Sequence, residues 1–190
     1  MKITRTLVVS VMLLLLSAAC DNPSDSTIVP DELLNRVVIT LLDSIDQDSR
    51  VLTFVDADGP SGSEAPVITG DTLAPGRTYY GLIDLYSLYR GNADSVKRMT
   101  EEIREAGTSH QFFYLPDNAL KELVRTEITD RDADNLPIGL EFKLRTSDIA
   151  MPAAGMLKVV LSHFEQAGAK NGVDRSDESD VDIDFPIVVR

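Results

Sequence analysis

The chain has 190 residues with no tryptophan, one cysteine and two histidines, and its 31 acidic against 18 basic side chains give a formal net charge of −13. This charge argues against a nucleic-acid-binding protein and against electrostatic docking on an anionic membrane, because phosphates would be repelled. A single cysteine excludes an internal disulfide, so stability must come from an apolar core.

The first twenty residues resemble a bacterial lipoprotein signal. Lys2 and Arg5 precede an apolar run over 7–16, and three small residues at 17–19 lead directly to Cys20. Ten residues give about 15 Å of helix, roughly half of a ~30 Å hydrocarbon core, so the run is typical of a cleaved segment and not of a membrane span. The resemblance implies that the thiol of Cys20 is acylated. Ordinary secretion, with an incidental cysteine, is the alternative.

This interpretation divides the chain into three parts. We expect a lipoprotein signal peptide over 1–19, the lipidated Cys20 with a flexible tether over 20–35, and a β-sandwich domain over 36–190. Cleavage leaves 16 basic against 31 acidic residues, a net charge of −15. Membrane contact would therefore come from the acyl chains alone. We expect the outer rather than the inner membrane, with the domain facing the periplasm or the cell surface.

Alternation of apolar and polar residues dominates the domain and predicts β-strands. The segments are 37–42, 51–55, 66–69, 77–89, 110–114, 124–129, 140–146, 157–164 and 181–189. One stretch has helical period instead, with Val96, Met99 and Ile103 on one face, Asn92 or Asp94 as the cap, and Gly107 at the end. The pattern predicts a mainly β protein, an antiparallel immunoglobulin-like β-sandwich of about eight strands with one short amphipathic helix.

Four blocks of the sequence are specific: FVDADG…APVIT from residue 54, TEEI…HQFFY from residue 100, LPIGL from residue 136 and DIDFPIVV from residue 182. Together they resemble a family of short gram-negative lipoproteins. Such proteins are sometimes labelled as a type 1 periplasmic binding fold. That fold has two α/β lobes, which this strand pattern does not support. The resemblance therefore implies a location in the cell envelope and says little about chemistry.

The spacing of Asp130, Asp132, Asp134 and Glu141 matches positions 1, 3, 5 and 12 of a calcium-binding EF-hand loop. Asn135 stands where that loop needs glycine, and the flanking segments are strands, so a calcium loop of another kind is the stronger form of this hypothesis. The alternative is a solvated turn in which the side chains bond their own backbone. No cofactor is required by the sequence, and Ca²⁺ is the ion that this loop could bind.

His110 and His163, the only histidines, lie near the ends of predicted strands. If these strands are neighbours, the two imidazoles and Glu165 could bind zinc or copper. Packing or surface exposure of the two rings is the alternative.

Four tyrosines of the segment 77–89 alternate between its two faces, with Tyr80 and Tyr86 on one face and Tyr79 and Tyr89 on the other. One pair is expected in the core, and Tyr80 with Tyr86 could form a platform for a ligand or partner.

The sequence contains no nucleophile elbow, no metalloprotease helix and no phosphate loop, so we expect no enzyme. The best interpretation is a lipid-anchored, non-catalytic binding module for a small ligand, a glycan or an outer-membrane partner. The alternative is a structural or assembly accessory that binds only protein and could have a calcium-stabilised loop.

Overall fold

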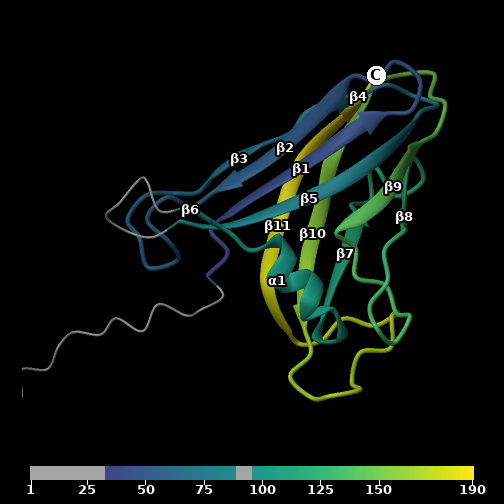
Figure 1. Ribbon diagram of the computed structural model, residues 1–190. Helices are drawn as coiled ribbons and strands as arrows, with labels where there is room; N and C mark the ends of the chain where they lie inside the picture. The colour runs from purple at the N-terminus through teal and green to yellow at the C-terminus, as the bar shows by residue number, and fades with distance from the viewer. Residues whose placement is uncertain (1–32, 89–95) are drawn as a thin grey trace, which may run out of the picture.

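Two β-sheets face each other in the computed structural model, which describes residues 33–88 and 96–190 (Figure 1). The strands are β1 (Arg36–Asp43), β2 (Ser49–Val55), β3 (Val67–Thr69), β4 (Asp71–Leu73), β5 (Thr78–Leu88), β6 (Val96–Arg98), β7 (His110–Pro116), β8 (Val124–Ile128), β9 (Glu141–Thr146), β10 (Ala153–His163) and β11 (Glu178–Val189). The helical elements are α1 (Thr100–Glu105) and the 3-10 turn η1 (Gly107–Ser109). This arrangement confirms the predicted mainly β sandwich with one short helix.

The strand order is β3-β2-β1-β5-β9-β8 in the first sheet, where β6 also pairs with β5, and β4-β11-β10-β7 in the second. All pairs are antiparallel except the parallel pair of β4 with β11. The described residues contain eleven strands, where nine segments had a strand pattern and a sandwich of about eight strands was predicted. The two strands without a predicted segment, β4 and β6, have three residues each.

The predicted helix is shorter than its periodicity indicated. Its first apolar residue, Val96, lies in β6, which pairs with the end of β5. The Arg98 guanidinium binds the Asp84 carboxylate across this pair, 2.9 Å from its Nε. The helix begins only at Thr100, whose hydroxyl accepts a hydrogen bond from the Leu85 amide at 3.0 Å. The predicted caps, Asn92 and Asp94, lie outside the described residues.

A glycine allows the chain to cross from one sheet to the other. Gly70 separates β3, in the first sheet, from β4, in the second. A Cβ atom at this position would lie only 1.7 Å from the carbonyl oxygen of Pro186 in β11. The crossing therefore requires a residue without a side chain, and it places β4 beside β11.

The core lies between the sheets and consists of the inward members of each alternating strand. Its largest fully buried side chains include Tyr79, Phe112, Phe142 and Phe185. The ring of Phe142 occupies the space that a Cβ on Gly81 would need, which explains a glycine in the middle of β5. Each such side chain contributes about 1.5–3 kcal/mol through burial, so this interior stabilises the fold without a disulfide.

Candidate functional site

The strand register brings the two histidines together. His110, at the start of β7, is directly opposite His163, at the end of β10. The flanking bond from the Phe164 amide to the Ser109 carbonyl, at 2.8 Å, places the histidines at a non-hydrogen-bonded position, where opposed side chains approach most closely. Their rings stack with centroids 4.6 Å apart and an interplanar angle of 17°.

A β-bulge supplies a carboxylate to the same place. Leu161 pairs with Val181, but the next residue, Ser162, pairs with Ser179, so Asp180 is skipped in the register. A bulge turns the extra residue away from strict alternation. Oδ2 of Asp180 consequently lies 3.3 Å from Nε2 of His110, and Oδ1 lies 3.7 Å from Nδ1 of His163.

We call these three residues the His-Asp cluster. Their ligand atoms all lie within 4.8 Å of one another, and among the described residues this is the one group of three metal-ligating side chains that meets this spacing. The strands of the two histidines are neighbours, which was the condition for the suggested metal site, but Asp180 takes the position that the sequence suggested for Glu165, which is exposed. No local sequence signal pointed to Asp180 as a partner of the histidines, because its orientation depends on the bulge.

The backbone fixes the orientation of the His110 ring. Nδ1 of His110 lies 3.0 Å from the carbonyl oxygen of Ala106, between α1 and η1, and 3.1 Å from the hydroxyl of Ser109. A carbonyl oxygen only accepts, so Nδ1 carries a proton, and the Ser109 hydroxyl itself donates to the same carbonyl. This leaves Nε2 directed at Asp180. Only 2% of the His110 side chain is exposed, against 17% for Asp180 and 30% for His163.

The predicted calcium residues do not converge on one point. Both oxygens of Asp130 accept backbone amides, from Gly139 and Leu140 at 2.8 and 3.0 Å. Asp134 is exposed, and Glu141 pairs with the guanidinium of Arg104 at 3.2 Å. Calcium binding by this loop stays a prediction, and the geometry favours the alternative of a self-bonded turn.

Asp132 completes that turn and has a cation of its own. Its Oδ1 accepts the amides of Asp134 and Leu136, and its Oδ2 lies 2.7 Å from Nζ of Lys170. Both side chains of this ion pair are 1% exposed. Asn135 adopts the left-handed conformation, with φ of 62°, that the turn requires.

The pKa values of Asp132 and Lys170 are both lowered, but for different reasons. Burial by itself would raise the pKa of Asp132, but hydrogen bonds from Lys170 and from the amides of Leu136 and Asp134 outweigh it and lower that pKa. For Lys170 burial prevails, and its pKa is lowered in spite of the neighbouring carboxylate. Lys170 also donates to the Gly107 carbonyl at 2.7 Å, so it ties two loops to η1.

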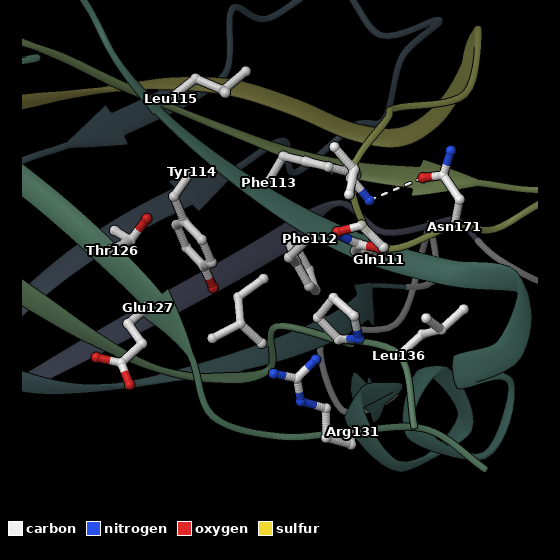
Figure 2. A pocket seen from close by; sticks show the side chains of 14 residues that line it. Gln111, Phe112, Phe113, Tyr114, Leu115, Thr126, Glu127, Arg131, Leu136 and Asn171 are labelled. Carbon is white, nitrogen blue, oxygen red and sulfur yellow. Dashed lines mark hydrogen bonds between the residues drawn. The ribbon is translucent and has the colours of Figure 1, made fainter. Parts of the chain in front are cut away.

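A groove of about 540 Å³ lies between β7 and β8, the edge strands of the two sheets (Figure 2). Its walls are residues 111–115 of β7, 126–128 of β8, and the loop residues 131, 136–137 and 171–173. Figure 2 shows Thr126 and Glu127 on one side of the groove and Leu136 and Asn171 on the other. No sequence pattern pointed to this groove, because it forms between segments that are adjacent only in the folded chain.

The main chain of β8 is open on the groove side. Thr129 donates to Glu141 at 2.9 Å and Ser147 donates to Leu123 at 2.8 Å. Hydrogen-bonded residues alternate along an antiparallel pair, so the odd-numbered residues of β8 bond to β9, and the main-chain groups of Thr126 and Ile128 point away from it.

The edge of β7 is partly covered. The amide of Phe112 donates to the Ile138 carbonyl at 2.6 Å, and the hydroxyl of Tyr114 donates to the Gly139 carbonyl at 2.6 Å. Phe113 is half-buried and Leu115 is 36% exposed, and both side chains line the groove. They give the β7 side of the groove an apolar surface.

The described tyrosines of β5 lie on alternate faces of the first sheet, as the alternation predicted. Tyr79 is fully buried, and its hydroxyl accepts the Ala74 amide at 2.8 Å. Tyr80 is 50% exposed on the outer face of the first sheet, and the Arg36 guanidinium lies 5.1 Å from the ring centre of Tyr86 on that face. Tyr89 lies outside the described residues.

The predicted lipidation site, Cys20, and the signal peptide are also outside the described residues. Within 33–88 and 96–190, no helix has the length and apolar character needed to cross a bilayer.

In comparisons with known proteins, no protein-family model, no curated protein and no solved structure matches the chain.

Proposed function

We propose that the protein is a lipid-anchored binding module of the bacterial cell envelope, which holds an extended segment of a protein partner in the groove between β7 and β8. The proposed role is binding without catalysis. It rests on one observation, the groove of about 540 Å³ beside the open main-chain edge of β8.

An unpaired strand edge favours a peptide over other ligands. The outward amides and carbonyls of Thr126 and Ile128 have the spacing that an added strand needs, and main-chain pairing of this kind supplies affinity in many peptide-binding domains. A glycan or a compact small molecule would not use this repeating pattern. The open edge therefore favours a protein partner among the classes that the sequence left open.

The groove walls add side-chain selectivity. Leu136, Pro137 and the half-buried Phe113 offer apolar contacts, whereas Glu127 and Arg131 provide charges of both signs. Glu127 already pairs with Arg145 at 2.8 Å. We expect the bound segment to alternate apolar and polar residues, because neighbouring side chains of a strand point to opposite faces.

The N-terminal pattern supports the location. A positive n-region, a ten-residue apolar run and small residues before Cys20 are typical of lipoproteins. Incorporation of labelled palmitate, lost in Cys20→Ala, tests the anchor, and membrane fractionation then tests the proposed outer-membrane location.

Site-specific photo-crosslinking in intact cells tests the groove. A photoreactive residue at Val173, 78% exposed on the groove wall, should form adducts with a partner protein. The matched control is Met151, which is 77% exposed on a different loop and should form none of these adducts. Identical adducts from the two positions would contradict the proposal.

A second pair of variants tests the strand edge itself. Thr126→Pro removes the outward amide, which an edge strand tolerates, while Thr126→Val keeps the amide and the side-chain shape. Loss of one main-chain hydrogen bond should reduce adduct yield by about 2–10-fold in Thr126→Pro only. Equal yields from the two variants would show that the edge is not used.

A further inference from the structure

We propose that His110, His163 and Asp180 form a binding site for a divalent transition-metal ion, with zinc as the ion that fits best. This site is separate from the groove, and its test does not depend on the proposed function.

The donor atoms favour such an ion. Two imidazole nitrogens and one carboxylate oxygen are the ligands that zinc and its neighbours prefer, whereas calcium requires six to eight oxygens. Three protein ligands leave at least one position for water or another ligand.

The spacing is close to that of a coordinated ion. In tetrahedral coordination at about 2.0–2.2 Å, two ligand atoms lie about 3.3–3.6 Å from each other. The two separations are 3.3 Å from Oδ2 of Asp180 to Nε2 of His110, and 3.7 Å from Oδ1 to Nδ1 of His163, so each nitrogen faces its own carboxylate oxygen. To bind one ion, the ligand atoms, which lie within 4.8 Å of one another, have to approach by about 1 Å, and the more exposed His163 ring, which stacks on His110 at 17°, has to turn so that its nitrogen points at the ion.

The surroundings of His110 match those of a metal ligand. Its Nδ1 donates to the Ala106 carbonyl, and its Nε2 lies 3.3 Å from Oδ2 of Asp180. Metal-bound histidines usually have such a bond from the other ring nitrogen, which fixes both tautomer and ring orientation. Nε2 is thus the nitrogen that an ion between His110 and Asp180 would bind.

The ion would join three strands. The ligands lie at the start of β7, the end of β10 and the bulge of β11, which meet near η1 at the end of the sandwich that lies away from the C-terminus (Figure 1). His163 is 30% exposed and provides the path by which an ion enters.

Zinc titration of the full chain tests the site. The protein carries Cys20→Ser, to remove the only thiol, and is kept in mild detergent. Calorimetry should give one bound Zn²⁺ per chain. Because the chain has only two histidines, imidazole NMR signals report on this site alone, and both rings should respond to zinc and not to millimolar calcium.

Two ligand variants and one control separate the site from general binding to an acidic chain. Asp180→Asn and His163→Gln should each weaken zinc binding by more than about 10–100-fold, the range seen when only a second-shell partner is lost. Glu165→Gln, at an exposed carboxylate just beyond His163, should bind like the parent protein. Asp180→Asn and His163→Gln change two different, partly exposed side chains. If one of these variants does not fold, the other still tests the site.

Unmoved imidazole signals at saturating zinc, or parent-like affinity in Asp180→Asn, would overturn the proposal. Equal weakening in Glu165→Gln would also overturn it, because the ion would then bind to surface carboxylates.

Discussion

The acidic loop over 130–141 and the His-Asp cluster show two ways to place a carboxylate in this fold. In the loop, Asp132 has a protein cation, Lys170, at 2.7 Å and two backbone amides as donors. In the cluster, Asp180 faces two imidazoles, and the buried one binds the Ala106 carbonyl through its other nitrogen. The loop therefore contains the counter-charge that it needs, whereas in the cluster the counter-charge would come from the proposed ion.

A count of carboxylates is therefore a poor guide to metal binding in this protein. The loop has the better calcium spacing in sequence, but its side chains are occupied by bonds within the protein. The cluster has a single carboxylate, yet the geometry leaves it directed at nitrogen ligands. Removal of the Lys170 charge from the loop should therefore lower the free energy of unfolding, whereas removal of the Asp180 charge from the cluster should not.

The largest expected effect is that of Lys170→Met. This variant keeps much of the side-chain volume but leaves the Asp132 carboxylate buried without a cation. Breaking a buried pair in this way should lower the free energy of unfolding by about 3–5 kcal/mol, measured by urea unfolding.

Two controls accompany this variant. Lys158→Met removes a cation from an exposed pair with Asp182 and should cost at most about 1 kcal/mol. The double variant Lys170→Met with Asp132→Asn removes both charges and should recover part of the loss, since the amide oxygen still accepts the backbone bonds. If Lys170→Met is no worse than Lys158→Met, the loop does not depend on its internal cation.

Acid should weaken the loop in a defined window. The pKa of Asp132 in the folded protein lies below its ordinary value of 3.8, so the carboxylate stabilises the fold above that value. This contribution is lost as the pH falls through the lowered pKa, with a slope of at most about 1.4 kcal/mol per pH unit for one group. Urea unfolding between about pH 2 and pH 5 should show a shallower slope in Asp132→Asn than in the parent protein. Parallel curves for the two proteins would contradict this role for Asp132.

The fold followed from the sequence where the pattern was local. The alternation of Val37, Ile39 and Leu41 with half-buried neighbours predicted β1, because one face of a strand must be apolar when it covers a core. The residues of β6 were assigned to the helix instead, since Val96 fits helical and strand spacing equally well and pairing with β5 decides between them. The strand β4 is too short to show a pattern of its own.

The site was predictable only in part, for a related reason. The histidines were singled out because there are only two, and the structure places them opposite each other. Asp180 depends on a bulge, and Lys170 lies 38 residues from its partner Asp132. The groove depends on the approach of two sheet edges. Such features arise from tertiary pairing, for which a single sequence has no local signal.

The smallest expected effect, and the one that best distinguishes the two regions, is that of Asp180→Asn in the metal-free protein at neutral pH. The new amide donates where the carboxylate only accepted, so it can bond to Nε2 of His110. We expect no loss in the free energy of unfolding, and a gain of up to about 1 kcal/mol. Urea unfolding in the presence of a chelator measures the change, with Asp182→Asn on the exposed face of β11 as the control. A loss above about 2 kcal/mol would show that Asp180 already has its counter-charge in a protonated imidazole, as Asp132 has in Lys170, and the contrast between the two regions would then disappear.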